Sequence, residues 1–108
     1  MQIILSKKAR RDMEQLTTAT AVRIEKKLRW FAAQENPLAF SKRVQHPTQM
    51  LFRFRIGDYR AVFRLEGRTL EIIFILTVKH RRESYRDINI TISYVPAMPP
   101  DAKNRESP

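Results

Sequence analysis

The chain has 108 residues, no cysteine and a net charge of +10, from 21 Lys and Arg against 11 Asp and Glu. This length fits one domain, and the lack of cysteine excludes disulfides and thiolate metal sites. No apolar run approaches the ~20 residues that a membrane-spanning helix needs, and the apolar stretch near the N-terminus is too short for a signal peptide. We therefore expect a cytoplasmic protein that does not enter a membrane.

The excess of positive charge predicts an anionic partner. Residues 88–108 carry as many acidic as basic side chains, so the excess belongs to the preceding part of the chain. We predict a single domain over residues 1–87. Residues 88–108 then form either an extra strand, because isoleucines alternate with polar residues at their start, or a disordered tail, because prolines and polar residues follow.

The beginning of the chain predicts a strand and a helix. Gln2–Leu5 (QIIL) is short and rich in β-branched residues, which favours a strand. Ser6 is suited to cap a helix in which Ala9, Met13 and Leu16 recur at helical spacing. The residues between them are charged, so this helix should bury one face only.

A second helix is predicted from about Thr20 to Gln34, and the Asn36-Pro37 pair ends it. Trp30 and Phe31 lie on this helix, where core packing is the usual role of such a pair and partial exposure would mark a protein contact. Residues 38–50 show no clear periodicity, so we expect a loop there.

The next part of the chain predicts three strands. Apolar and basic residues alternate over 52–56 and again over 60–65, and Gly57-Asp58 between them is a turn signal. Leu70–Val78 (LEIIFILTV) is almost entirely apolar, which is typical of a strand covered on both faces. The predicted fold is therefore α+β, with an N-terminal strand and a two-helix hairpin packed on a small antiparallel sheet.

The alternation in the hairpin predicts a basic face. If Arg55 lies opposite Arg60, the phenylalanines face the helices and the other face carries arginines; a shift of one residue would invert the two faces. Guanidinium groups match the geometry of phosphate and stay charged. A solvated face that protects a sheet edge is the alternative interpretation. The arginines of the predicted face are Arg53, Arg55, Arg60 and Arg64.

A second basic cluster, KHRRESYRD, follows the apolar strand at Lys79–Asp87. We expect it to leave the sheet as a turn or short helix and to reach the surface that carries the arginines. Together the two clusters favour binding of a phosphate backbone. Tyr85 in this cluster is suited to stack on a base or to handle a proton, or alternatively to anchor the chain end.

The sequence offers little else for chemistry. His46 and His80 do not form a paired acid–base system, and no metal-binding motif or Gly-rich phosphate loop is present, since the chain has only two glycines. We therefore expect neither a metal nor another cofactor.

The order of strand, two helices and three strands, with RIGDYR in the first hairpin turn and HRRESY after the last strand, resembles the RelE/ParE toxins of bacterial type II toxin–antitoxin systems. The resemblance spans about residues 2–87 and includes SKKARRDMEQL as the first helix of the family. It implies one of two activities. RelE-like members are metal-free endonucleases that cut messenger RNA in the ribosomal A site, whereas ParE-like members inhibit DNA gyrase and cleave nothing.

In the RelE-like branch the arginine of the Y-R motif is a catalytic, phosphate-binding group, and it corresponds to Arg60. The resemblance also implies catalytic roles for Arg81 and Tyr85. Arginine is a weaker general base than the lysines that the family carries on its basic strand, which makes His80 a further candidate base. The residues expected to bind RNA are Arg53, Arg55, Arg64, Lys79, His80 and Arg82.

Gyrase inhibition does not need the Arg–Tyr pair, so its presence favours the nuclease. We expect a ribosome-dependent, metal-independent mRNA endonuclease that inhibits translation. The alternatives are a ParE-like gyrase inhibitor and a non-catalytic nucleic-acid-binding relative. The partners that the resemblance implies are an acidic cognate antitoxin, the ribosome with its mRNA, and operator DNA reached only through the toxin–antitoxin complex.

Overall fold

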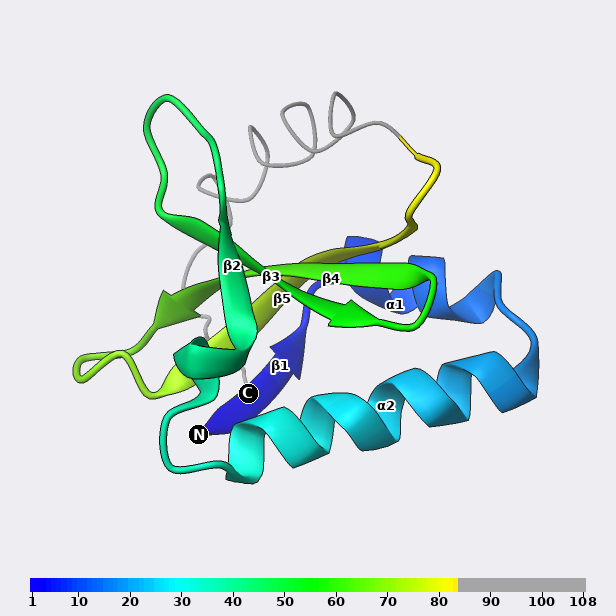
Figure 1. The fold of residues 1–108 in the computed structure, drawn as a ribbon, viewed down its shortest axis with the longest axis horizontal. Helices are drawn as coiled ribbons and strands as arrows, with labels where there is room; N and C mark the ends of the chain where they lie inside the picture. Colours follow the sequence, from blue (N-terminus) through cyan, green and yellow to red (C-terminus); the bar gives the residue numbers. More distant parts are fainter. Residues whose placement is uncertain (84–108) are drawn as a thin grey trace.

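The computed structural model describes residues 1–83, which form a five-stranded sheet with two helices (Figure 1). The strand order is β1-β5-β4-β3-β2, and β1 runs parallel to β5 while the other neighbours are antiparallel. The predicted α+β fold is confirmed, although the sheet is mixed. In chain order the elements are β1 (Gln2–Leu5), α1 (Lys7–Glu14), α2 (Thr18–Ala33), the 3₁₀ helix η1 (Pro37–Phe40), β2 (Ser41–Val44), β3 (Leu51–Ile56), β4 (Tyr59–Glu66) and β5 (Ile72–His80).

Both helices begin at side-chain caps. The hydroxyl of Ser6 accepts a hydrogen bond from the backbone N–H of Ala9 at 3.0 Å, and that of Thr17 accepts one from Thr20 at 3.3 Å. The predicted helices are confirmed, with α2 starting two residues earlier than expected. In Figure 1, α1 runs away from the end of β1, and α2 returns beneath the sheet.

Two apolar clusters hold the sheet, one on each face. In the main cluster, Phe54 stacks between Phe31 of α2 and Phe63 of β4, with ring centroids 4.1 and 4.4 Å apart. The smaller cluster lies on the face away from α2 and is centred on Val62 and Leu76, both fully buried. The nearly continuous apolar run of β5 is explained because β5 contributes to both clusters.

The prediction of a loop over residues 38–50 was wrong in its first part. Residues 37–40 form η1, and residues 41–44 form β2, which pairs with β3 at the edge of the sheet. This strand has the sequence SKRV, in which only Val44 is buried, so it shows no apolar alternation. Short, charged edge strands of this kind are protected against pairing with other chains. Their short length and lack of apolar alternation also make them difficult to predict from a sequence.

The last strand lies two residues further along the chain than predicted. Leu70 is outside β5, with a left-handed φ of 55° in the turn that follows β4. Lys79 and His80, which were expected to leave the sheet, pair with residues of β4. Apolar character ends at Val78, but the ladder of backbone hydrogen bonds continues. The strand predicted over residues 88–94 lies outside the described residues.

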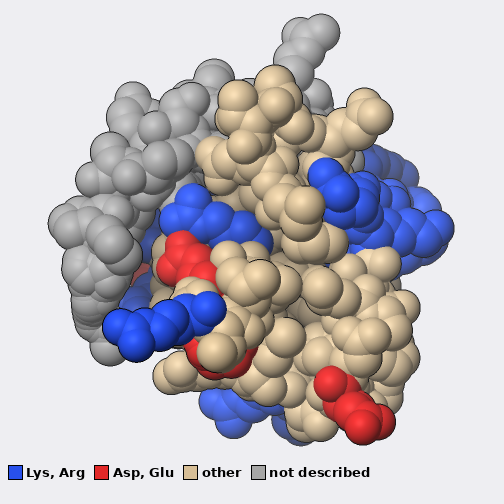
Figure 2. All heavy atoms as spheres, turned by 90° about the vertical axis from the view of Figure 1, so that its left-hand side faces the viewer, with Lys and Arg blue, Asp and Glu red and all other residues tan. Residues whose placement is uncertain are grey.

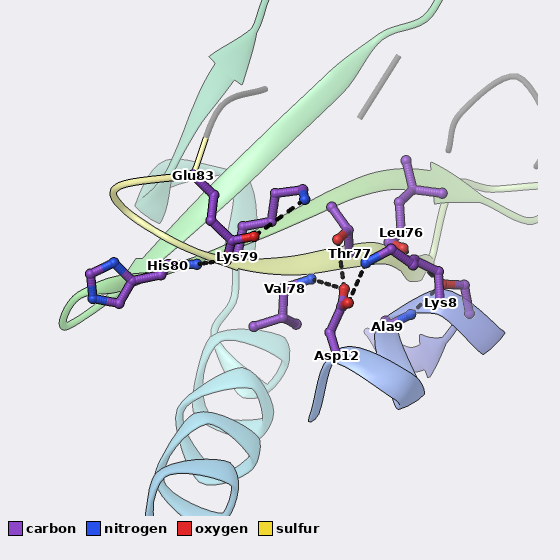
Figure 3. A network of polar contacts seen from close by, with 10 residues as sticks. Lys8, Ala9, Asp12, Leu76, Thr77, Val78, Lys79, His80 and Glu83 are labelled. Atoms are coloured by element: carbon purple, nitrogen blue, oxygen red, sulfur yellow. Dashed lines mark hydrogen bonds and ion pairs between the residues drawn. The ribbon is translucent and has the colours of Figure 1, made fainter. Parts of the chain in front are cut away.

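The free edge of β5 is completed by side chains of the α1 segment (Figure 3). Beyond the end of β1, the hydroxyl of Ser6 donates to the carbonyl of Leu76 at 2.8 Å. Asp12 accepts hydrogen bonds from the backbone N–H of Val78 at 2.9 Å and from the hydroxyl of Thr77 at 2.6 Å. These contacts satisfy buried polar groups that would otherwise lack partners.

We predict that Asp12→Ala destabilises the protein by about 2–4 kcal/mol, because it leaves the buried Thr77 hydroxyl and a strand N–H without an acceptor. The matched control is Glu14→Ala, an exposed position on the same helix, which should change stability by less than about 0.5 kcal/mol. Urea unfolding of both variants measures the difference. Equal stability of the two variants would contradict the role given to Asp12.

Candidate nucleic-acid interface

The turn between β3 and β4 fixes the register that places the basic side chains. Gly57 has φ +60°, which the first central position of a type II′ hairpin turn requires. Arg55 then lies opposite Arg60, and Arg53 opposite Val62, so the predicted register is confirmed. The arginines share the face of the sheet that points away from α2.

A line of three basic residues crosses the sheet near this turn. Arg55 of β3 pairs with Arg60 of β4, which pairs in turn with Lys79 of β5. We call Arg55, Arg60 and Lys79 the cationic row. Adjacent strands lie about 4.8 Å apart, and like charges placed directly opposite one another destabilise a sheet. The arrangement therefore opposes folding and fits a surface that binds an anion.

Arg60 is the centre of the cationic row. Its Nη1 donates a hydrogen bond to the carbonyl oxygen of Arg81 at 3.2 Å, which anchors the guanidinium. Its Nε is buried, and no atom of residues 1–83 accepts a hydrogen bond from it. A buried donor without an acceptor is uncommon in folded proteins and requires an explanation. Here it shows that residues 1–83 leave part of the hydrogen-bonding capacity of this anchored cation unused.

Arg81 is held at the same end of the sheet by Asp58. Its backbone N–H donates to the carbonyl of Asp58 at 2.7 Å, and its Nε lies 3.6 Å from the Asp58 carboxylate. Through these two contacts the β3–β4 turn holds the segment that follows β5. This contact places Arg81 beside Arg60 although they are distant in sequence.

Lys79 and Glu83 complete this end of the sheet (Figure 3). We call these two residues, together with Arg60, Arg81 and Asp58, the junction. Lys79 is only 4% exposed, and its Nζ lies 3.5 Å from a carboxylate oxygen of Glu83. The other oxygen of Glu83 accepts a hydrogen bond from the backbone N–H of His80 at 3.0 Å. Glu83 therefore closes the turn after β5 and compensates one charge of the row.

Both histidines have structural contacts. The Nδ1 of His80 accepts the backbone N–H of Arg82 at 3.2 Å, and its ring packs edge-to-face with Tyr59 at 5.2 Å. The Nδ1 of His46 accepts two backbone N–H groups of its own loop. These bonds leave only Nε2 of His80 for contact with a substrate.

The remaining predicted site residues are distributed unevenly. Arg53 lies two residue pairs from the cationic row on the same face, between Val62 and Lys42. Arg64 lies further from it, where its Nε donates to Glu66 at 2.6 Å and its guanidinium sits over the Phe74 ring. Its charge is compensated within its own strand. Arg82 is exposed in the turn after β5, and Tyr85 lies outside the described residues.

Two carboxylates of this junction were not predicted as site residues. The sequence analysis identified Asp58 only as part of the turn signal, and Glu83 only as a member of the second basic cluster. Each lies in a turn. Asp58 contacts Arg81 from a distant segment, whereas the partners of Glu83 are the nearby Lys79 and His80. The sequence signal for Glu83 is its position four residues after Lys79.

The opposite end of the molecule differs from this junction. Figure 2 shows that uncharged surface occupies the centre of that end, with basic side chains in separate groups around it. Among residues 1–83, no three His, Cys, Asp or Glu side chains gather closely enough to hold a metal ion. Within the same residues no helix has the length and apolar character needed to cross a membrane.

Comparisons with known proteins agree with this architecture. A family model described as the ParE toxin of type II toxin–antitoxin systems (parDE) matches residues 3–85. No curated protein matches the chain. The chain belongs to the RelE/ParE family of toxins from type II toxin–antitoxin systems.

Solved structures of toxins share the fold. The toxin–antitoxin complex RelBE2 from Mycobacterium tuberculosis contains a chain with 25% identity and a TM-score of 0.64, over 74% of this chain and 96% of that one. A chain of the archaeal RelE–RelB complex from Pyrococcus horikoshii has 21% identity and a TM-score of 0.59, over 77% and 97%. The isolated RelE toxin of E. coli has 16% identity and a TM-score of 0.55, over 87% and 97%.

We predict that the neutral ring of His80 carries its proton on Nε2, because Nδ1 accepts the N–H of Arg82. Nitrogen chemical shifts of the imidazole, measured by NMR at a pH where the ring is neutral, distinguish the two tautomers. A proton on Nδ1 would contradict the geometry of the turn after β5 and would return His80 to the candidate bases.

Proposed function

We propose that this toxin is a ribosome-dependent, metal-independent endonuclease that cuts mRNA and so inhibits translation. The observation that carries the proposal is the buried, acceptorless Nε of Arg60 at the centre of the cationic row. A phosphodiester supplies the anionic oxygens that this donor lacks, and guanidinium–phosphate hydrogen bonds are strong and directional. The resemblance of the RIGDYR and HRRESY motifs to the RelE-like branch supports the same activity.

Cleavage of the RNA backbone has three chemical requirements. The 2′-hydroxyl must lose a proton and form a bond from its oxygen to phosphorus, the pentavalent phosphate must be stabilised, and the 5′-oxygen must accept a proton as its bond to phosphorus breaks. Donors fixed in advance at the phosphate stabilise the charge that develops there. Arg60 meets this requirement because its Nη1 is already anchored to the carbonyl of Arg81.

The other residues divide by position. Arg81, held by Asp58, supplies a second guanidinium to the phosphate. Tyr85 is assigned a catalytic role through the resemblance. Arg55 binds a flanking phosphate beside Arg60, with Arg53, Arg82 and the Nε2 of His80 near it. Lys79, which is buried and paired with Glu83, acts through the positive charge that it adds to the row. Arg64 has the weakest case as an RNA ligand because Glu66 already compensates it.

The second candidate function is inhibition of DNA gyrase without cleavage. The observation that favours it is the match of residues 3–85 to the ParE family model. A gyrase inhibitor would use the basic surface for contact with the enzyme or its DNA, and removal of a single guanidinium would then weaken binding without abolishing a chemical step.

An acidic cognate antitoxin is the expected partner. The related M. tuberculosis toxin was solved as a toxin–antitoxin complex, and the charge of +10 favours an anionic partner. We propose that such an antitoxin covers the cationic row, and that operator DNA is reached only through the complex.

We predict that Arg60→Ala lowers the rate of mRNA cleavage about 10²–10³-fold, the cost of removing one donor to a developing anion. Growth and the 5′ ends of a translated reporter mRNA are followed after induction in bacteria. Arg68→Ala is the matched control, since Arg68 is exposed in the turn after β4, at the opposite end of the sheet from the cationic row. Unchanged cleavage by Arg60→Ala would contradict the assignment.

A further inference from the structure

A second basic surface lies on the other side of the β3–β4 turn. An open groove of about 630 Å³ runs between this turn and α2. We call it the α2 groove. Figure 1 shows the turn above the first half of α2. The residues lining the groove are Arg23, Lys26, Lys27 and Trp30 of α2 and Arg55, Ile56, Gly57 and Asp58 of the turn.

The charges of the α2 groove are strongly unbalanced. Four cations line it against the single carboxylate of Asp58, which is already engaged with Arg81. Within residues 1–83, Arg23, Lys26 and Arg55 make no ion pair. By contrast Arg29, which lies on α2 outside the groove, is paired with Glu25. The groove therefore keeps positive charge that the rest of the helix neutralises.

The groove also has an aromatic wall. Trp30 is 44% exposed, although a large aromatic side chain on a helix usually packs inward. The ammonium of Lys27 lies 4.3 Å from its ring centroid, and the Phe40 ring packs against Trp30 in a T-shaped contact with centroids 5.1 Å apart. A cationic groove combined with an exposed aromatic ring is the arrangement by which proteins bind single-stranded nucleic acid without reading its sequence.

We propose that the α2 groove binds the backbone of single-stranded RNA, with a base against Trp30. This rests on the proposed function, because Arg55 belongs both to the groove and to the cationic row. Arg55 points away from α2 but lies at the end of β3 that borders the groove. A strand with one phosphate at Arg60 therefore passes Arg55 and then rounds the β3–β4 turn into the groove. The groove then holds the RNA that flanks the cleaved bond.

Trp30 is the only tryptophan of the chain, so its fluorescence reports directly on the groove. The probe is a 2′-O-methyl oligouridylate of about 12 nucleotides, within the range of single-strand site sizes. It has no 2′-hydroxyl and is not cleaved. We expect it to quench Trp30, with an affinity that falls as salt rises. Anisotropy of the labelled oligonucleotide gives the affinity independently.

The double variant Arg23→Glu/Lys26→Glu should weaken binding at least about tenfold. It should also reduce the slope of log K against log salt by about 1.4, because each phosphate that the protein neutralises on a single strand contributes about 0.7. The matched control, Lys7→Glu/Arg10→Glu, makes the same change of charge on exposed positions of α1 and should retain the quenching and most of the affinity.

Equal affinities of the two double variants, or no change of Trp30 fluorescence on RNA binding, would overturn the inference. So would quenching by poly-glutamate but not by RNA, which would assign the groove to an acidic protein. Because the probe is not cleaved, binding in the groove is measured separately from catalysis. Loss of the nuclease proposal would leave this result standing, and loss of groove binding would leave the test of Arg60 unaffected.

Discussion

The hydrogen bonding of β5 on both of its edges is the constraint on which the rest of this structure depends. On one edge β1 pairs first, and the side chains of Ser6 and Asp12 then continue where β1 ends. On the other edge β4 pairs along the full strand, to its last residue, His80. Because this ladder continues past the apolar residues, Lys79 lies beside Arg60 and the turn that follows β5 contacts Asp58.

The junction at the end of β5 gathers positive charges at a cost in folding stability. Three cations in register repel one another, and Glu83 compensates part of this charge through its ion pair with Lys79. The contrast with Arg64 is informative, since that arginine lies on the same strand but is paired with Glu66 and packed on Phe74. If the basic residues served only solubility, we would not expect Arg64 to be paired with an acid while Arg60 lies among other cations.

Most of the fold could be predicted from the sequence because its signals are local. The helix cap at Ser6, the alternation in the hairpin and the turn at Gly57 each act within a few residues, and the register of Arg55 with Arg60 followed from the turn. The edge strand β2 could not be predicted, since four residues with one buried side chain give no periodicity.

The site was predictable only in part, for a related reason. The basic residues were identifiable by type, and the resemblance of two motifs assigned roles to several of them. Their arrangement depends on contacts between distant segments, such as Asp58 with Arg81, which no local pattern encodes. Lys79 was expected in a turn because its strand stops being apolar one residue earlier, whereas backbone pairing, not side-chain character, decides where β5 ends.

The central claim is that the cationic row binds the phosphate at which mRNA is cut. The most direct test uses the purified full chain in two parallel reactions, one with ribosomes programmed with a defined mRNA and one with DNA gyrase and relaxed plasmid. The account predicts new mRNA 5′ ends within the codon in the ribosomal A site and unchanged supercoiling by gyrase. Intact mRNA together with inhibited supercoiling would contradict it and would assign the basic surface to the gyrase-inhibiting branch of the family.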